Sequence, residues 1–255
     1  MSSQNPLILI TNDDGITAPG IRALVNAMKV LGDVVVVAPD KPQSGMGHAI
    51  TINSTLRLHE VKQDGLTEYA CSGTPVDCVK IAIDKILPRK PDLLVSGINH
   101  GANSSINVIY SGTMSAAVEG AIEAIPSIGF SLCNYSIEAD FAAAAHFAAI
   151  VAKNVLDHGL PAGVCLNVNI PDVPLDIIKG VKVCRQAKAL WHEEFDERKD
   201  PYGRKYYWLT GKFINLDEGT DTDQWALENN FVSVVPTQFD LTAHNAIKDM
   251  KKWEM

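Results

Sequence analysis

The sequence has few cysteines, and their arrangement excludes a disulfide framework and a structural zinc site. They number five, an odd count, and none belongs to a C-x-x-C pair. No two Cys or His residues have the spacing of a structural zinc site, and every cysteine lies in or beside an apolar stretch. We therefore expect free thiols and a reducing cytoplasm as the compartment. The cysteines are Cys71, Cys78, Cys133, Cys165 and Cys184.

Long apolar runs and an early basic segment are also missing. The first Lys or Arg is Arg22, and the apolar run at 7–10 is far too short for a signal peptide or a membrane span. We therefore expect neither a targeting segment nor contact with a membrane.

Basic residues are outnumbered by acidic ones. Lys and Arg total 22 against 30 Asp and Glu, which is a formal net charge of −8. Proteins that bind long nucleic acid displace phosphate counterions with a basic face, so this balance argues against that class. A small phosphorylated ligand remains compatible with it, because a bound metal ion supplies positive charge locally. With 46% hydrophobic and 20% charged residues, the composition is that of a folded domain.

What the sequence does contain is an alternation of short apolar runs with segments of helical periodicity. The runs are continuously apolar, which is typical of parallel strands covered on both faces. We therefore predict a Rossmann-like, doubly wound α/β core with a mainly parallel sheet over residues 1–185. The predicted strands are 6–11, 34–38, 92–96, 127–132, 164–170 and 181–185. The predicted helices are 21–31, 76–87, 113–124 and 139–158.

Residues 186–255 differ in character from this core. Aromatic and charged residues mix around a predicted turn at 201–203, and a polar stretch precedes a strand at 231–235 and a helix near 241–253. We predict a C-terminal appendage, a β-hairpin and a helix, that serves oligomerisation. Its aromatic residues are interpreted as packing or interface residues rather than a base-stacking platform, because the chain is acidic. They include Trp191, Tyr206, Tyr207 and Trp208.

Oxygen-bearing side chains follow several predicted strands, at the edge where open α/β sheets bind ligands. Asp13 and Asp14 come after the first strand, and two adjacent carboxylates repel each other unless a cation lies between them. Ser44 and Asn99 follow two further strands. This all-oxygen set suits Mg²⁺, Mn²⁺ or Ca²⁺. The alternative is that the aspartate pair forms an ordinary turn or helix cap.

A candidate anion site, Ser-Gly-Thr at 111–113, lies where a predicted helix begins. Free N–H groups at a helix N-terminus bind phosphate, and glycine permits close approach, although a plain serine or threonine cap is the alternative. His48 is a candidate proton donor or phosphate contact, or else a solvated or structural histidine. Glu119 is interpreted as part of a solvated helix face, and His100 is given no role.

Competing nucleotide and hydrolase motifs are absent. No G-x-G-x-x-G follows the first strand, no G-x-x-x-x-G-K-[ST] occurs, and there is no G-x-S-x-G elbow. An aspartyl nucleophile in a D-x-D pattern would need Asp where Asn12 stands. These absences argue against a dinucleotide-binding dehydrogenase, a P-loop enzyme, an α/β-hydrolase and an aspartyl-phosphate phosphatase.

Six longer motifs occur in order along nearly the whole chain. They are 11–16 (TNDDGI), 37–40 (VAPD), 47–51 (GHAIT), 73–79 (GTPVDCV), 95–103 (VSGINHGAN) and 110–113 (YSGT). Together with Ser44 and the aromatic region near residue 200, they resemble the SurE family of stationary-phase survival proteins, which are metal-dependent nucleotidases. Several long motifs in one order are far more specific than any single short pattern.

The resemblance implies hydrolysis of nucleoside 5′- or 3′-monophosphates and, in some members, of short polyphosphate. It implies one divalent cation, Mg²⁺ or Mn²⁺, and a homodimer or homotetramer in which C-terminal segments exchange between subunits. The implied metal ligands are Asp13, Asp14, Ser44 and Asn99. The expected phosphate and substrate contacts are Asn12, His48, Asn103, Ser111, Gly112 and Thr113. The expected catalytic residues are Asp13, Asp14 and Asn103.

Two other classes compete with this reading. A receiver-type signalling module also carries an acidic pair after its first strand. It needs an acceptor aspartate after a later strand, where Asn99 and Asn103 stand, and it is about half as long as this chain. A metal-dependent glycoside or amide hydrolase is disfavoured by the phosphate-type helix N-terminus.

Overall fold

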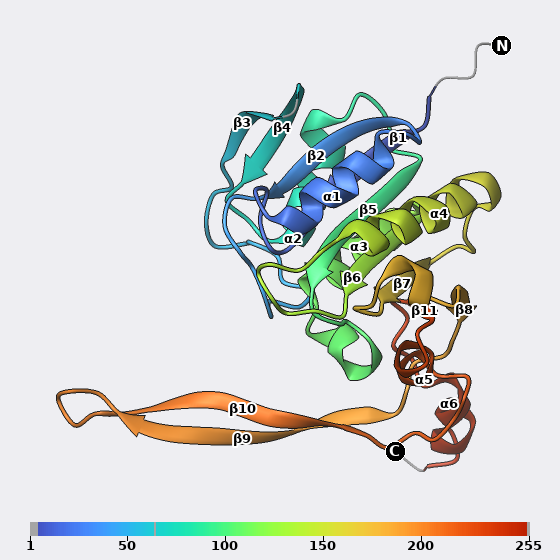
Figure 1. Cartoon of the computed structure of the whole chain (residues 1–255). Helices are drawn as coiled ribbons and strands as arrows, with labels where there is room; N and C mark the ends of the chain where they lie inside the picture. Colours follow the sequence, from blue (N-terminus) through green and yellow to red (C-terminus); the bar gives the residue numbers. More distant parts are fainter. Residues whose placement is uncertain (1–4, 64, 254–255) are drawn as a thin grey trace.

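A nine-stranded sheet forms the centre of the computed structural model, which describes residues 5–63 and 65–253 (Figure 1). The strands lie in the order β3-β4-β2-β1-β5-β6-β7-β11-β8. They are β1 (Leu7–Thr11), β2 (Asp33–Pro39), β3 (Leu58–Gln63), β4 (Leu66–Cys71), β5 (Leu93–His100), β6 (Ser127–Leu132), β7 (Val164–Ile170), β8 (Val181–Val183) and β11 (Val232–Gln238).

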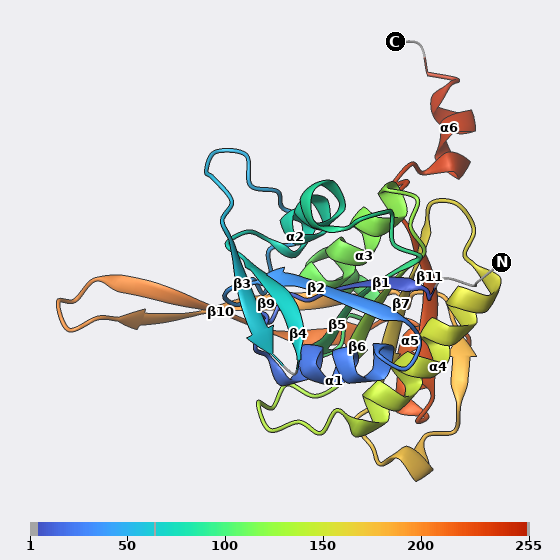
Figure 2. The ribbon, with the colours of Figure 1, turned by 90° about the horizontal axis from the view of Figure 1, so that it is seen from above.

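Most of this sheet is parallel. Neighbouring strands run parallel from β4 across to β7, whereas β3 and β11 pair antiparallel with β4 and β7. Helices α1 (Pro19–Met28) and α4 (Ala142–His158) cover one face, and α2 (Pro75–Ile81) and α3 (Gly112–Ile122) cover the other (Figure 2). The predicted Rossmann-like, doubly wound α/β class is confirmed.

The core lies between the sheet and these helices, and local sequence explains each layer. All residues of β1 are buried, as a strand covered on both faces requires. Buried side chains on α1 recur at helical spacing, and Pro19 starts the helix with its fixed φ. At the start of α2, Thr74 and Asp77 form a reciprocal capping box.

The sheet changes its direction of growth between β1 and β5. The chain passes from β1 to β2 on one side and later adds β5, β6 and β7 on the other. The segments that follow β1 and β5 therefore diverge, and the crevice between them is where open α/β sheets bind ligands. A register shift between Ser96 and Asn99 carries β5 on to His100, past its predicted end at residue 96.

Several element boundaries differ from the prediction. Strands β3 and β4 were not predicted, because β3 is an edge strand with several exposed residues and lacks a continuous apolar run. The sequence pair Asp64-Gly65 between them is a recognised hairpin signal. The helix predicted at 76–87 is α2 followed by a π-helical turn, η1 (Ala82–Ile86).

The C-terminal part carries a separate antiparallel hairpin, β9 (Ala189–Lys199) and β10 (Lys205–Asn215), which extends away from the body in both views (Figures 1 and 2). This hairpin was predicted; α5 (Asp223–Glu228) was not, and α6 (His244–Met250) is shorter than expected. Strand β11 returns to the main sheet between β7 and β8. The division of the chain at residue 185 stays a prediction.

No helix in the part of the chain that the structure describes combines the length and apolarity of a bilayer-crossing segment.

Candidate active site

A cavity of about 380 Å³ opens at the carboxyl ends of β1 and β5. Its volume is within the range of small-molecule sites. Five separate segments of the chain reach it: those after β1, after β2 and after β6, the one from the end of β5 to the start of α3, and β9. Six residues singled out from the sequence line it, namely Asp13, Asp14, Ser44, Asn99, Asn103 and Ser111.

The carboxylate of Asp13 lies deep in this cavity. It is only 4% exposed, and the hydroxyl of Thr113 donates a 2.5 Å hydrogen bond to its Oδ1. Burial raises the pKa of Asp13 to about 6; the Thr113 hydrogen bond opposes that rise, and the negative charge of Asp14 adds to it. A buried carboxylate whose charge is this poorly compensated is a strong candidate for binding a cation.

The N-terminus of α3 packs directly against this carboxylate. A Cβ built on Gly112 would lie 2.7 Å from the Cβ of Asp13 and 3.0 Å from its Oδ2, so only glycine fits there. The Ser111 side chain caps the helix by accepting a 3.0 Å hydrogen bond from the Met114 N–H. Ser111 can therefore cap α3 while the first turn of the same helix, at Gly112, packs against Asp13. The helix-cap and anion-site interpretations of residues 111–113 are compatible.

His100 holds the second carboxylate of the pair. The Oδ2 of Asp14 lies 3.1 Å from His100 Nδ1 and accepts a 3.2 Å hydrogen bond from the His100 backbone N–H. The ring also stands edge-on to Phe141, with centroids 4.9 Å apart. His100 was given no role in the sequence analysis; in the structure its ring and its backbone N–H orient Asp14.

The other two predicted ligands present oxygen atoms to the same space. The Asn99 amide nitrogen donates to the carbonyls of His100 and Gly101 at 3.1 and 2.8 Å, which leaves its side-chain oxygen as the group suited to a cation. Ser44 is exposed, on a loop fixed to the site by the 2.7 Å hydrogen bond from the Gln43 N–H to the Asp13 carbonyl.

Asn103 belongs to a buried amide network at the edge of the cavity. Its Nδ2 donates to the Ser131 hydroxyl at 2.8 Å, and its backbone N–H donates to Asn169 Oδ1 at the same distance. Asn167 donates to the Asn103 carbonyl at 2.8 Å and accepts from Asn169 at 2.9 Å. Such a network holds Asn103 in one orientation before any ligand arrives.

Asn12 and His48, both predicted to contact substrate, form hydrogen bonds with other residues of the protein. Asn12 is fully buried and donates to the Gly15 carbonyl at 2.9 Å, which shapes the turn after β1. His48 Nε2 lies 2.9 Å from Glu119 Oε2, and Lys80 also pairs with Glu119. The interpretation of Glu119 as a solvated residue is wrong: it is 2% exposed and anchors the loop that carries His48. The roles of Asn12 and His48 toward substrate stay predictions.

The donor set is consistent with a hard divalent cation. It consists of two carboxylates, an amide oxygen and a hydroxyl, all oxygen atoms facing one cavity. Within residues 5–63 and 65–253, no cluster of three or more His, Cys, Asp or Glu side chains has metal-binding geometry. The proposed donor set contains only two such residues, and an amide and a hydroxyl oxygen make up the rest.

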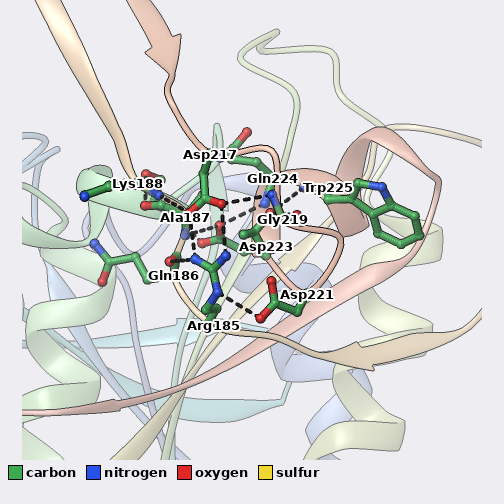
Figure 3. Close-up of polar contacts among 12 residues, drawn as sticks. Arg185, Gln186, Ala187, Lys188, Asp217, Gly219, Asp221, Asp223, Gln224 and Trp225 are labelled. Atoms are coloured by element: carbon green, nitrogen blue, oxygen red, sulfur yellow. Dashed lines mark hydrogen bonds and ion pairs between the residues drawn. The ribbon is translucent and has the colours of Figure 1, made fainter.

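Polar contacts tie the root of the hairpin to the core (Figure 3). Arg185 forms a bidentate pair with Asp217 at 2.6 and 2.9 Å and bonds Asp221 at 2.9 Å, joining the segments before β9 and after β10. The buried Asp223 accepts from the N–H groups of Ser105 and Ala187 at 2.7 and 2.9 Å. These bonds connect the hairpin to η2 (Ser105–Ile109), the turn that leads into the cavity wall.

Sequence reasoning missed part of the cavity lining. Asn107, Tyr110, Tyr135 and Trp191 all line it together with the predicted residues. Trp191 comes from β9, far along the chain, and was interpreted as a packing or interface residue. The signal available in the sequence was the position of Tyr110 immediately before Ser111; nothing local placed Trp191 at the site.

Comparison with known proteins identifies the family that this chain resembles. The model of the family described as Survival protein SurE matches residues 8–193. The chain is 66% identical to the 5′-nucleotidase SurE of Christiangramia forsetii, over 100% of this chain and 99% of that protein. It is 62% identical to the 5′-nucleotidase SurE of Flavobacterium johnsoniae, with the same coverage of 100% and 99%.

A solved structure matches the fold as well. The crystal structure of the SurE protein from Aquifex aeolicus superposes with a TM-score of 0.85 at 42% sequence identity, covering 96% of this chain and 98% of that chain. The likeness thus extends through the hairpin and beyond the residues that the family model matches. On the agreement of motifs, fold and full-length relatives, this chain belongs to the SurE family.

Proposed function

We propose that this protein hydrolyses nucleoside 5′-monophosphates to a nucleoside and phosphate with one divalent cation. The observation that carries the proposal is the packing of Gly112, at the start of α3, against the buried carboxylate of Asp13. It joins a cation-binding group to a helix N-terminus that attracts phosphate. Relatives that are 66% and 62% identical over the full chain carry the name 5′-nucleotidase, which supports the same substrate class.

Asp13, Asp14, Ser44 and Asn99 are the residues that would hold the cation, Mg²⁺ or Mn²⁺. When bound, such an ion neutralises a phosphoryl oxygen and lowers the pKa of a coordinated water. The support from this chain is the all-oxygen donor set and the adjacent carboxylates of buried Asp13 and half-buried Asp14, which repel each other without a positive charge nearby.

The remaining cavity residues would orient the phosphate and stabilise its developing charge. The backbone N–H groups at the start of α3 would bind an anion beside Asp13, and Ser111 and Asn103 line the same space. The carboxylates of Asp13 and Asp14 are the groups there that can accept a proton from the attacking water. His100 would keep Asp14 in position during that transfer.

We extend the proposal to 3′-monophosphates and short polyphosphate. A side cavity of about 460 Å³ adjoins the candidate active site across Asp14 and His100, and Lys41 is part of its lining. Lys41 shares this lining with two carboxylates, Asp14 and Asp40, and would be the group that compensates the charge of a longer phosphate chain.

Phosphate release from 5′-AMP tests the activity directly. We expect purified protein to release phosphate with Mn²⁺ and to lose that activity in excess EDTA, since the acidic pair cannot approach a phosphate without a cation between them. Heat-denatured protein serves as the blank, and re-addition of Mn²⁺ after EDTA should restore the rate. Absence of release from folded protein in both conditions, and with 3′-AMP, would reject a nucleotidase.

We also propose a homodimer or homotetramer in which the hairpin packs against a second copy of the chain. The two strands of the hairpin pair only with each other among the described residues, and an isolated two-stranded ribbon is marginally stable at best in water. Large apolar side chains such as Phe195 and Trp208 are 67% and 59% exposed on it. A second subunit would cover them.

Light scattering after size-exclusion chromatography checks this assembly. We expect a mass of two or four times the 27.6 kDa of one chain. The double substitution Phe195→Glu and Trp208→Glu should lower that mass, because it places charge in the covered surface. The single substitution Asp176→Asn, at an exposed residue of the core, is the control. A wild-type mass of a single chain would contradict the proposal.

The proposed compartment is the cytoplasm. The five cysteines are free, and burial raises the pKa of the Cys133 and Cys165 thiols to about 12, which keeps both in the unreactive protonated form.

A further inference from the structure

A second cavity, of about 550 Å³, continues from the candidate active site toward the hairpin. The two spaces share two lining residues, Tyr110 and Trp191. Their characters differ. Carboxylate, amide and hydroxyl groups dominate the lining on the Asp13 side, whereas aromatic and aliphatic groups prevail on the hairpin side. The rest of the second lining is Glu193, Leu209, Thr210 and Gly211.

We propose that this second cavity binds the nucleobase of the substrate, with Trp191 and Tyr110 as the aromatic surfaces on which the base stacks. The inference rests on the proposed nucleotidase activity and adds the residues that select a nucleotide over other phosphate esters. A nucleoside monophosphate matches the two joined cavities. Its charged phosphate suits the polar lining near Asp13, and its flat, weakly polar base suits the aromatic and aliphatic lining near the hairpin.

Trp191 is held in place for such a role. Its indole Nε1–H donates a 2.7 Å hydrogen bond to Asn107 Oδ1, and its ring meets Phe213 edge-on with centroids 5.6 Å apart. Asn107 belongs to η2, and the bonds of Asp223 described above fix η2 to the start of β9. The ring therefore has a fixed orientation before a base arrives, which reduces the entropy lost on binding.

Tyr110 approaches the same space from the phosphate side. It directly precedes Ser111, the cap of α3, and its carbonyl accepts a 3.3 Å hydrogen bond from the Gly47 N–H. A ring beside the cap lies where the sugar and base of a phosphate-bound nucleotide would extend. On the opposite wall, Glu193 of β9 pairs with Gly211 of β10, so both strands of the hairpin contribute to the lining.

The substitution Trp191→Ala, compared on substrates with and without a base, tests the proposal. Stacking of a base on an aromatic side chain corresponds to roughly a 5- to 150-fold change in affinity. We expect kcat/KM for 5′-AMP to fall by that factor, while kcat/KM for ribose 5-phosphate stays within about twofold. Trp191→Phe keeps a ring face and should retain most of the preference for 5′-AMP.

Trp253→Ala is the matched control, since Trp253 is an exposed tryptophan outside the hairpin and lines neither cavity. It should leave the ratio between the two substrates unchanged. An equal loss on both substrates in Trp191→Ala would mean that Trp191 only supports the fold, and no loss on either would mean that the base lies elsewhere. Both results overturn the proposal.

Calorimetric titration with adenosine separates this inference from the activity on which it rests. Adenosine carries a base and no phosphate, so its binding does not require hydrolysis. We expect wild-type protein to bind adenosine and Trp191→Ala to bind it at least about fivefold more weakly. If the wild type hydrolysed neither phosphate ester, the proposed function would be wrong. The titration would still show whether Trp191 binds the base. Equal binding by both proteins would reject the base site.

Discussion

Replacing Asp13 with asparagine is expected to abolish most activity and, at the same time, to stabilise the metal-free protein. Activity should fall by more than about 100-fold, because even residues that merely support metal ligands contribute about 10- to 100-fold. Asparagine retains an oxygen that can accept the hydrogen bond from Thr113, so the local geometry is preserved. What disappears is the negative charge that burial disfavours.

The sign of the stability change follows from the pKa of Asp13. Folding raises this pKa from 3.8 to about 6, so the folded state binds the proton more tightly than the unfolded state. Stability therefore falls as pH rises from about 4 to about 6, and above that range the charge destabilises the fold by up to about 3 kcal/mol. Asparagine carries no charge, so the variant avoids this loss at neutral pH.

Thermal unfolding in EDTA, with and without added Mn²⁺, measures both effects. We expect the variant to unfold at a higher temperature than wild type at pH 7.5, by about 2–4 °C for each kcal/mol, and to match it near pH 3.5. Mn²⁺ should raise the Tm of wild type and leave the variant almost unchanged. Asp176→Asn, at an exposed carboxylate, should have the Tm of wild type in EDTA and the same rise in Tm with Mn²⁺. An Asp13→Asn variant with wild-type turnover at low Mn²⁺ would contradict the site assignment.

Replacing Gly112 with alanine is expected to cause the second large loss of activity. The added methyl would lie 2.7 Å from the Cβ of Asp13, closer than carbon atoms pack, so either the aspartate or the start of α3 must move. A displacement of about 1 Å at a reacting centre costs on the order of 100-fold in rate. We therefore expect kcat/KM for 5′-AMP to drop by about that factor, with weaker Mn²⁺ binding.

Gly120→Ala supplies the structural control for this variant. It lies on the same helix, and its added methyl would meet the Ser127 hydroxyl in the core, away from the carboxylate pair. We expect Gly120→Ala to lower Tm while the folded protein keeps its kcat, whereas Gly112→Ala loses kcat beyond any loss of Tm. Steady-state kinetics and thermal unfolding on both variants separate the two cases. Wild-type kinetics in Gly112→Ala would show that the packing of α3 on Asp13 is not part of catalysis.

The fold class could be predicted because its determinants are local. Each central strand is a continuous apolar run, and the helices between them repeat their apolar residues at helical spacing, which is typical of a parallel sheet covered on both faces. The edge strand β3 escaped prediction for the opposite reason: it is partly exposed, and its pairing with β4 rather than its own composition makes it a strand.

The acidic pair and the helix start could also be predicted, because the carboxyl ends of parallel strands meet at one edge whatever the details of packing. That rule brings Asp13, Asn99 and Ser111 to one cavity without any knowledge of distances. It does not say which side chain turns inward. Asn12 and His48 follow strands as the others do, yet Asn12 bonds Gly15 and His48 bonds Glu119.

By itself, the sequence determined the α/β class and the placement of the acidic pair, Asn99 and the start of α3 at one edge of the sheet, since each depends on neighbours in the chain or on strand order. Only the tertiary structure decided that His100 orients Asp14, that Glu119 is buried, and that Trp191 reaches the cavity. The physical reason is the same in all three cases. These contacts join segments far apart in sequence, and their energies depend on burial and geometry that no local pattern encodes.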